Sequence, residues 1–400
     1  MKQSISVVIG KNFGDEGKGL ATDYLCRGPG EVLNIRHNGG AQSGHTVETE
    51  DGKRFIFHQL GAGSFRHSRT FWADTYYPDL YKLKDELDGF ISAAGFAPGI
   101  SCDRATCTVL PCDVLVNMAL ETMRGDKRHG SCGMGINEAD LRIKAGYGIT
   151  IREFLADDAA VLQDKLRRIR DEYLVKRLKE TGLADEDNEY TAMLRSDDVI
   201  ANMLEVMMRN ARFVNVVDDT ERLLRSYENI VFETGQGLLL DGECERFMPH
   251  VSASRTGLNN PVRFLKRYGL EPTDAVYVTR SYVTRHGAGP LPCTCGMGEL
   301  GDLQYDETNV PNAWQGTIRY ARHEGYREFV GPVLSDITQN GYNGRRTLFI
   351  THLNETDGMI RIQDGDVRAD DFVQRDEIKE VFDTVLGSAS RTSGDIYKIV

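Results

Sequence analysis

A short apolar run near the start of the chain meets a glycine-rich turn, in the stretch VVIGKNFGDEGKG at residues 7–19. This layout, followed by a helix-like segment, is typical of a loop that binds phosphate through backbone N–H groups. The loop departs from the usual P-loop template, because Phe13 stands four positions before Gly17 and no Ser or Thr follows Lys18. It also contains an Asp-Glu pair beginning at Asp15, whose charges would repel a phosphate. The stretch therefore predicts a phosphate site and leaves open why a carboxylate lies in it.

A second glycine-rich stretch, RHNGGAQSGHTV at residues 36–47, follows a predicted strand. Because glycine has no Cβ, Gly39, Gly40 and Gly44 would let the backbone approach a ligand closely. His45 follows directly, in a chain that already has a predicted phosphate loop. We therefore treat His45 as a candidate catalytic residue, with a structural histidine as the alternative.

Three further stretches place polar side chains at predicted strand ends. In VFETGQGLLLDGE (231–243), Gln236 lies between two glycines and could hydrogen-bond a planar heterocycle, although a β-turn explains the pattern equally well. VTRSYVTRHGAGPLP (278–292) has two arginines before a tight turn. WQGTIRYAR (314–322) contains Arg319 and a second arginine three residues later. Arginine offers a planar fork of donors, so these positions are candidates for binding a carboxylate or a phosphate.

The composition argues against several classes of protein. The 400 residues carry a formal net charge of −12, whereas a nucleic-acid-binding or membrane-binding surface would need a basic excess. Neither an N-terminal signal pattern nor a long apolar span occurs, so we expect a cytoplasmic protein. The eight cysteines are scattered without a CxxC pair, which indicates reduced thiols and makes zinc the weaker alternative.

Strand-like and helix-like patterns alternate along the chain. Apolar runs predict strands at residues 4–10, 31–37, 54–60, 68–74, 105–110, 228–235, 273–283 and 345–353. Helices are expected at residues 17–26, 78–90, 111–123 and through most of 153–226. The alternation predicts one large α/β domain over residues 1–400, with a mainly parallel sheet, helices on both faces, a P-loop-like phosphate-binding loop and a helical lobe at about 153–226.

Taken together and in this order, the motifs resemble one family, the adenylosuccinate synthetases. The resemblance is carried by GDEGKG (14–19), GGAQSGHT (39–46), FETGQGLLLD (232–241) and YVTRHGAGPLP (282–292). SCGMGINEADLR (131–142) and THLNETDG (351–358) match more weakly. The blocks span most of the chain, and several have drifted, so the chain looks like a divergent member.

The resemblance implies a reaction. Such enzymes join L-aspartate to the 6-oxo position of inosine monophosphate (IMP) through a 6-phosphoryl intermediate, driven by a nucleoside triphosphate with Mg²⁺. Asp15 would be the general base on the purine N1–H and would ligate Mg²⁺ with the Gly44 carbonyl, which explains a carboxylate in a phosphate loop. Lys18 would hold the triphosphate, His45 would stabilise charge as the phosphoryl group moves to O6, and Gln236 would orient the purine.

The resemblance also implies binding residues. The triphosphate and the metal ion would be bound by Gly14, Asp15, Glu16, Gly17, Lys18, Gly19, Gly44, His45, Thr46, His352 and Asn354. The purine monophosphate and aspartate would be bound by Asn12, Gln42, Ser131, Cys132, Arg142, Gln236, Ser252, His286, Thr317 and Arg319. Family members form homodimers in which an arginine of one subunit reaches the monophosphate of the other, and Arg142 is the best match for it.

Some positions differ from the family pattern. Cys132 matches a phosphate-contacting threonine, and the arginine run that clamps aspartate is reduced to Arg319 and Arg322. Members of the family recognise guanine with an aspartate. At the matching position this chain has Asn354, which can both donate and accept hydrogen bonds. Either GTP or ATP is therefore open as the energy donor, and we expect ATP to be accepted.

Three other interpretations stay open. The same chemistry on GMP or dGMP with ATP would give a 2-aminoadenylosuccinate, but the viral branch that does this lacks the loop aspartate that is retained here as Asp15. A non-catalytic nucleotide-binding homologue would have no need of a metal-ligating base inside a phosphate loop. A plain P-loop NTPase would need a Ser or Thr after Lys18. IMP is therefore the first-choice acceptor, ahead of dIMP, GMP and dGMP.

Overall fold

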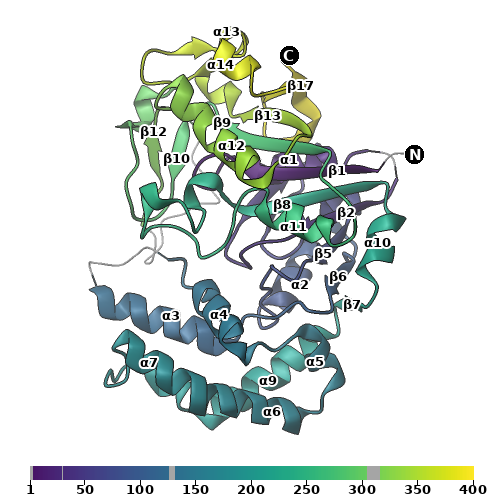
Figure 1. Ribbon diagram of the computed structural model, residues 1–400, viewed down its shortest axis with the longest axis vertical. Helices are drawn as coiled ribbons and strands as arrows, with labels where there is room; N and C mark the ends of the chain where they lie inside the picture. Colours follow the sequence, from purple (N-terminus) through teal and green to yellow (C-terminus); the bar gives the residue numbers. More distant parts are fainter. Residues whose placement is uncertain (1–2, 29, 126–130, 304–315) are drawn as a thin grey trace.

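In the computed structural model, which describes residues 3–28, 30–125, 131–303 and 316–400, the centre of the described part is a ten-stranded sheet (Figure 1). From edge to edge its strands are β17 (Ile396–Lys398), β16 (Thr384–Ser388), β13 (Arg345–Thr351), β9 (Asp274–Arg280), β1 (Ser4–Gly10), β8 (Asn229–Gly237), β2 (Val32–Arg36), β5 (Arg69–Trp72), β6 (Ile100–Asp103) and β7 (Asn215–Val217). β16 and β17 pair antiparallel, and the other neighbours pair parallel. The mainly parallel α/β sheet expected from the sequence is confirmed.

The central strands are apolar along their length because both faces of the sheet are covered. In β1, Ile5 and Val7 pack into the larger core cluster on one face, while Val8 packs with Leu20 of α1 (Lys18–Leu25) on the other. The first face is covered by α10 (Thr220–Ser226), α11 (Asn259–Lys266) and α12 (Tyr326–Asn340), which supply apolar side chains to the same cluster. Helices therefore lie on both faces, as expected.

Smaller sheets stand beside the main one. β3 (His45–Glu48) and β4 (Arg54–Phe57) form a hairpin, so the strand expected at 54–60 exists but lies outside the main sheet. A three-stranded sheet contains β10 (Val283–Arg285), β12 (Arg319–Ala321) and β11 (Thr294–Cys295). β14 (Met359–Ile360) pairs with β15 (Val367–Arg368), near the short helices α13 (Ala369–Phe372) and α14 (Asp376–Lys379).

A helical layer lies below the sheet in the view of Figure 1. It contains α3 (Pro111–Arg124), α4 (Ile136–Arg142), α5 (Ile151–Ala156), α6 (Ala159–Arg168), α7 (Val175–Thr181), α8 (Glu189–Leu194) and α9 (Asp197–Ala211). The helical lobe was expected at about residues 153–226. The layer begins earlier, with α3, and residues 215–217 within the expected range form the edge strand β7. Leu162 and Met207 share one core cluster with Phe57 and Trp72 of the sheet region. The helical layer therefore packs onto the sheet region through a shared apolar core.

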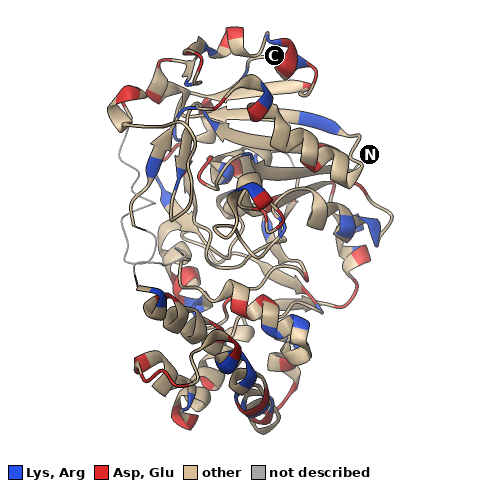
Figure 2. Ribbon diagram, turned by 60° about the vertical axis from the view of Figure 1, so that its left-hand side comes forward, with Lys and Arg blue, Asp and Glu red and all other residues tan. Residues whose placement is uncertain are grey.

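The outer helices carry charges of both signs, as Figure 2 shows. Across the end of α6 and the π-helical segment Ile169–Leu174 that continues it, Arg168 pairs with Glu172 at 3.2 Å, and both side chains are exposed. Exposed pairs of this kind contribute little stability. Their alternation indicates a solvated surface. Among the described residues, none of the helices has the length and apolar content that crossing a membrane requires.

Two expected elements are placed differently. The strand predicted at 105–110 is wrong: among the described residues that segment forms an isolated bridge, Cys107 with Thr150, and the strand is β6, a few residues earlier. Thr106 and Thr108 donate their hydroxyls to the carbonyls of Trp72 and Pro78, so the segment is held by side chains. The helix expected from residue 78 is α2 (Leu83–Ala94), because the Asp79 carboxylate accepts the N–H groups of residues 81 and 82 and forms a turn there.

Candidate active site

The phosphate loop between β1 and α1 is organised around the Glu16 side chain. Its Oε1 accepts the N–H groups of Asn12 (2.9 Å) and Gly14 (2.8 Å), and its Oε2 accepts the Lys18 ammonium at 3.0 Å. Lys18 also donates to the Gly14 carbonyl at 2.5 Å. Burial raises the pKa of Glu16, but Lys18 and the loop N–H groups outweigh it, so the net pKa lies below its usual value. The Glu16 carboxylate therefore shapes the loop from inside, a role that the sequence did not reveal.

Two glycines of the loop are required by geometry. Gly17 has a φ of 91°, in the left-handed region that other residues rarely adopt. A Cβ on Gly19 would lie 2.7 Å from the Thr46 carbonyl and 3.2 Å from the Cβ of His45. The start of α1 therefore lies directly against β3. This close approach brings Lys18 and His45, predicted from separate motifs, into one site.

Asp15 lies on the loop between two anchored neighbours and is half-buried. Its main-chain carbonyl accepts a hydrogen bond from Arg280 Nε at 2.5 Å. Arg280 also donates to the Tyr282 hydroxyl (3.1 Å), which in turn donates to Glu355 Oε2 (2.6 Å). This chain of hydrogen bonds ties the loop at residue 15 to the segments that follow β9 and β13. Arg280 is one of the two arginines that the sequence offered as candidates for binding an anion, yet here it donates to a carbonyl and a hydroxyl, and no role was predicted for Glu355.

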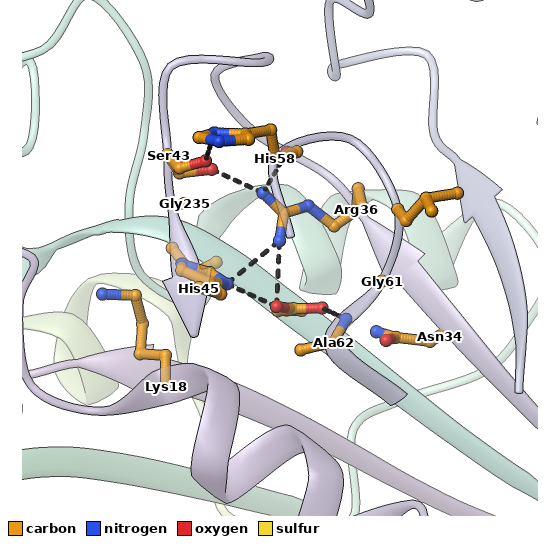
Figure 3. Close-up of polar contacts among 12 residues, drawn as sticks. Lys18, Asn34, Arg36, Ser43, His45, His58, Gly61, Ala62 and Gly235 are labelled. Carbon is orange, nitrogen blue, oxygen red and sulfur yellow. Dashed lines mark hydrogen bonds and ion pairs between the residues drawn. The ribbon is translucent and has the colours of Figure 1, made fainter. Parts of the chain in front are cut away.

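His45, at the start of β3, is buried, with 4% of its surface exposed. Its Nδ1 contacts Glu233 Oε1 closely, and Arg36 lies on the same carboxylate oxygen at 2.9 Å (Figure 3). The other ring nitrogen, Nε2, is buried without a hydrogen-bond partner among the described residues. Figure 3 shows Lys18 beside the ring. An unpartnered polar atom at a phosphate loop is what a site for an added ligand requires.

Gln236, at the end of β8, lies against the second glycine-rich loop. Its Oε1 accepts from Asn38 Nδ2 at 3.2 Å and from the Ser254 hydroxyl at 3.3 Å. A Cβ on Gly39 would lie 2.5 Å from Gln42 Nε2 and 3.1 Å from Gln236 Nε2, so the two amides meet over that glycine. The Gln42 Oε1 atom is buried without a hydrogen-bond partner in the described structure. Two side-chain amides therefore lie side by side, where they could recognise a heterocycle through hydrogen bonds.

The C-terminal end of β13 contacts the same loop. Thr351 donates its hydroxyl to the Glu16 carbonyl at 2.7 Å, and a Cβ on Gly17 would lie 3.1 Å from the Thr351 methyl group. His352 follows with a φ of 61°, and Asn354 is exposed two residues later. Thr351 therefore lies against the phosphate loop, and His352 and Asn354, the two positions named from the sequence for the energy donor, follow it in the chain.

The segment at residues 131 and 132 lies just before α4, whose start contacts the second glycine-rich loop. The Ser131 hydroxyl accepts from Asn117 at 3.0 Å, and burial raises the pKa of the Cys132 thiol. A Cβ on Gly40 would meet Ile136 at 2.6 Å, so the start of α4 abuts the second glycine-rich loop. Ser252 lies 3.0 Å from Ser254, which is the partner of Gln236.

Arg319 lies on β12 of the three-stranded sheet, His286 directly follows β10, and Thr317 lies two residues before β12. Arg319 donates to the Gly287 carbonyl at 2.7 Å, and His286 lies 3.2 Å from the Gly316 carbonyl. Thr317 is exposed. Arg285 spans from this sheet to the loop and stacks on Phe13 at 4.6 Å. The first two residues of the motif, 314 and 315, lie outside the described residues.

Arg142 does not lie where the sequence placed it. Its side chain is fully buried and donates to Asp113 Oδ1 and Oδ2 at 2.9 and 2.8 Å. It also donates to the carbonyls of Tyr147 (2.6 Å) and Thr108 (3.0 Å). The expectation that Arg142 reaches a neighbouring subunit is therefore wrong, because its guanidinium is held within its own chain.

The loop offers oxygen ligands of the kind that Mg²⁺ prefers. Asp15, which carries a carboxylate, is half-buried, and Gly44, which offers a main-chain carbonyl, is exposed. Within the described ranges, no group of three or more His, Cys, Asp or Glu residues could hold a metal ion alone. Mg²⁺ is commonly bound by one or two carboxylates together with substrate phosphates, and this donor set fits that mode.

Comparison with known proteins gives a consistent result. A family model described as adenylosuccinate synthetase matches residues 7–363. An adenylosuccinate synthetase of Prochlorococcus marinus subsp. pastoris is 30% identical over 366 residues, covering 89% of this chain and 77% of the relative. One from Synechococcus sp. is 29% identical over 401 residues, covering 95% of this chain and 85% of the relative.

Two solved structures share the fold. The fully ligated adenylosuccinate synthetase of Plasmodium falciparum superposes with a TM-score of 0.71 at 14% identity, covering 98% of this chain and 99% of that one. Cyanophage S-2L succinoaminodeoxyadenylate synthetase, bound to dGMP and to dATP as an energy donor, superposes with a TM-score of 0.61 at 16% identity, covering 100% and 96%. At these identities the likeness shows the fold alone.

Proposed function

The chain belongs to the adenylosuccinate synthetase family, and from this premise we propose that its site joins L-aspartate to IMP. As a member it is a C–N ligase that acts on a purine nucleoside monophosphate at the expense of a nucleoside triphosphate. The observation that carries the proposal is the convergence of Asp15 and Lys18 with His45 and Gln236. Their three segments meet through the contacts of Gly19 with His45 and of Gly39 with Gln236.

The first step is phosphoryl transfer to the purine. Asp15 accepts the proton from N1 of IMP, and the electron pair moves to O6, which becomes the nucleophile. O6 attacks the γ-phosphorus, and the nucleoside diphosphate leaves. Lys18 and the loop N–H groups hold the phosphates, and His45 Nε2 hydrogen-bonds the oxygens on which charge develops. In the second step the neutral amine of aspartate attacks C6, phosphate leaves with O6, and the amine nitrogen releases one proton to solvent.

The metal ion has a defined place in this proposal. The Asp15 carboxylate and the Gly44 carbonyl would hold Mg²⁺, with the remaining positions filled by phosphate oxygens and water. When bound, the ion neutralises phosphate charge and offsets the repulsion between that charge and Asp15. The homodimer implied by the family is likewise a proposal, which analytical ultracentrifugation would test.

A panel of substrates tests the function. Phosphate release should require L-aspartate, a purine monophosphate and a triphosphate together, and IMP should be preferred over dIMP, GMP and dGMP. The second candidate acceptor is dGMP, because the cyanophage enzyme of the same fold binds it. A preference for dGMP over IMP would replace the proposed acceptor. Phosphate release without aspartate and a purine monophosphate would reject the ligase and indicate a plain NTPase.

We predict that ATP serves as donor at least as well as GTP, because of Asn354. An aspartate at this position would make charge-assisted hydrogen bonds to guanine, each contributing about 1.5–3 kcal/mol, and would repel the N1 lone pair of adenine. The Asn354 amide can instead donate to adenine N1 and accept from its 6-amino group. Asn354→Asp should shift the ratio of kcat/KM values toward GTP by at least about tenfold.

The matched control for this prediction is Asn343→Asp, at the opposite end of β13, where the side chain is exposed. That variant should leave donor preference unchanged. A wild-type enzyme that prefers GTP by a hundredfold or more would contradict the assignment of Asn354.

We predict that Arg319 binds a carboxylate of aspartate. Among the described residues Arg319 has no carboxylate partner. Burial first, and then the charge of Arg319, lower the pKa of the neighbouring Arg285 to about 10. A dianion between two such guanidinium groups would relieve their repulsion. Arg319→Leu should raise the KM for aspartate at least about tenfold and leave the KM for the triphosphate near that of the wild type.

Arg322→Leu is the control for Arg319→Leu, because Arg322 is already paired with Asp366. Its effect on the KM for aspartate should be much smaller. If Arg319→Leu instead raised the KM for the triphosphate alone, Arg319 would belong to the nucleotide site.

A further inference from the structure

We propose that Lys11 is a site of covalent modification, at which small neutral aldehydes form an imine. The residue directly follows β1 and lies outside the residues proposed to perform the ligase reaction, so the inference does not depend on that function. It rests on a buried amine that has no anionic partner and that lines a pocket. The reaction joins Nζ to the aldehyde carbon and releases the aldehyde oxygen as water.

Strand β1 directs the Lys11 side chain toward α12. Side chains alternate between the two faces of a strand, and Val7 and Ile9 pack into the core cluster to which α12 contributes. The ladder continues past the end of β1, because the Lys11 N–H group donates to the Val278 carbonyl at 2.8 Å. Lys11 therefore points to the same face as Ile9. There its Nζ donates to the Phe329 carbonyl at 3.2 Å and lies 3.8 Å from the centre of that ring.

The Lys11 amine is buried without an ion pair among the described residues. Only 3% of the residue is exposed, and its hydrogen-bond partner is a neutral carbonyl. The carboxylates whose charge acts on it are Glu16 and Glu324. Each is already paired with another cation, Glu16 with Lys18 at 3.0 Å and Glu324 with Arg246 at 2.7 Å. A buried ammonium in this position therefore lacks the partner that would stabilise its charge.

These surroundings favour the neutral amine. Burial is the main cause that lowers the pKa of Lys11 to about 7, and the charges of Glu16 and Glu324 oppose it only in part. His323 adds no charge near neutral pH, because burial first, and then the charge of Lys11, lower its pKa to about 3. Roughly half of the Lys11 amines are therefore uncharged at pH 7, whereas an exposed lysine is almost wholly charged. An uncharged lysine amine in an apolar pocket is the nucleophile that forms Schiff bases.

A pocket of about 370 Å³ that opens to solvent is lined by Lys11. Its apolar lining includes Phe13, Leu239, Val283, Leu291 and Phe329. Arg322, Glu324 and Glu328 also line it, so charges of both signs face the pocket. Such a lining favours neither an anion nor a cation. A neutral molecule with a short apolar chain is the chemical class that suits it.

The atoms of the imine step balance without a further reactant. The uncharged Nζ attacks the carbonyl carbon, a proton moves from nitrogen to oxygen, and the resulting carbinolamine loses water to leave a C=N bond. The protonated imine carries the same charge as the Lys11 ammonium, so Glu16 and Glu324 stabilise it in the same way. The aldehyde comes from solution, and neither an oxidant nor a reductant takes part.

Reductive trapping on the full chain tests the inference. The wild-type protein is incubated at pH 7 with acetaldehyde and cyanoborohydride, whose hydride converts an imine into a stable ethylamine. Tandem mass spectrometry of peptides then gives the rate at each lysine. Lys11 should react at least about tenfold faster than exposed Lys266, because their neutral fractions differ by about a thousandfold. Modification of Lys11 no faster than that of Lys266 would overturn the inference.

Lys18 is the matched control for burial in the same experiment. It is as buried as Lys11, but the Glu16 carboxylate holds its ammonium at 3.0 Å, and an ammonium is not a nucleophile. Lys18 should therefore react more slowly than Lys266. If Lys18 reacted as fast as Lys11, the missing ion pair of Lys11 would not be the cause of its reactivity, and the inference would fail.

A second aldehyde tests the proposed class of ligand. Pyridoxal 5′-phosphate is larger and carries a phosphate dianion, which Glu324 and Glu328 at the pocket would repel. With this probe Lys11 should show no preference over Lys266. A preference for Lys11 as large as the one seen with acetaldehyde would contradict a small neutral ligand.

Leu239→Trp tests whether the pocket gives access to the amine. Leu239 is half-buried in the lining, and a larger side chain there should slow the reaction of Lys11 by at least about tenfold without changing that of Lys266. Leu334→Trp, at an exposed position of α12, is the matched control and should leave both rates unchanged. A folded Leu239→Trp protein in which Lys11 reacts at the wild-type rate would reject the pocket. If the variant does not fold, the two aldehydes on the wild type decide.

Discussion

Asp15→Asn should lower kcat by at least about a thousandfold in a protein that stays folded. General base catalysis contributes roughly 10²–10⁴-fold, and the loss of a metal ligand adds to that. The loop should keep its shape, because its anchors are the Glu16 carboxylate and the main-chain carbonyl of Asp15, which the substitution retains. Steady-state kinetics at saturating aspartate, IMP and triphosphate measure the effect, and thermal unfolding checks the fold.

Asp88→Asn on α2 is the matched control for Asp15→Asn, since that carboxylate is exposed and pairs only with Lys84 in the described structure. It should leave kcat within about twofold of the wild type, as surface substitutions generally do. An Asp15→Asn enzyme within tenfold of the wild type would show that neither base catalysis nor metal binding depends on Asp15.

His45→Ala should lower kcat by roughly 10²–10³-fold while changing triphosphate affinity only a few-fold. The ring nitrogen that faces the phosphate site contributes mainly where charge develops in the transition state, and removal of one such donor typically has this effect. Glu233 keeps Arg36 and the Ala62 N–H group as partners, so the variant does not bury an unpaired carboxylate. Kinetics with each substrate varied would separate kcat from KM.

His67→Asn is the control for His45→Ala, because His67 is exposed and its φ of 58° is one that asparagine tolerates. It should behave as the wild type. A loss confined to the KM for the triphosphate in His45→Ala would make His45 a binding residue and remove it from the chemical step.

The site could be located from the sequence because its motifs follow strands. Parallel strands end at the same edge of a sheet, so glycine-rich turns after β1, β2 and β8 converge wherever those strands are neighbours. β1 pairs with β8, and β8 pairs with β2, so the loops around Asp15, His45 and Gln236 meet at one edge. These strands could be predicted from apolar runs in the sequence, because strands of a sheet that is covered on both faces are apolar along their length.

Partners that are distant in the chain could not be predicted. Glu233 lies in an apolar strand 188 positions from His45, and only the pairing of β2 with β8 brings them together. From the sequence, Glu16 was expected to help bind the triphosphate and the metal ion. In the structure its side chain instead points into the loop and accepts N–H groups that come together only when the loop is folded. Arg142 was misplaced for a related reason, since its partner Asp113 lies on another helix and a resemblance of motifs carries no information on burial.

The central claim is that O6 of the purine becomes phosphorylated and then leaves with phosphate. Incubation of the enzyme with [6-¹⁸O]IMP, L-aspartate, Mg²⁺ and ATP or GTP tests this directly, with mass spectrometry of the phosphate released. The account predicts one ¹⁸O atom in each phosphate formed with product and none in the purine ring of the product. Phosphate free of ¹⁸O, with the label retained at C6 of unreacted IMP, would mean that the triphosphate is hydrolysed by water and would contradict the account.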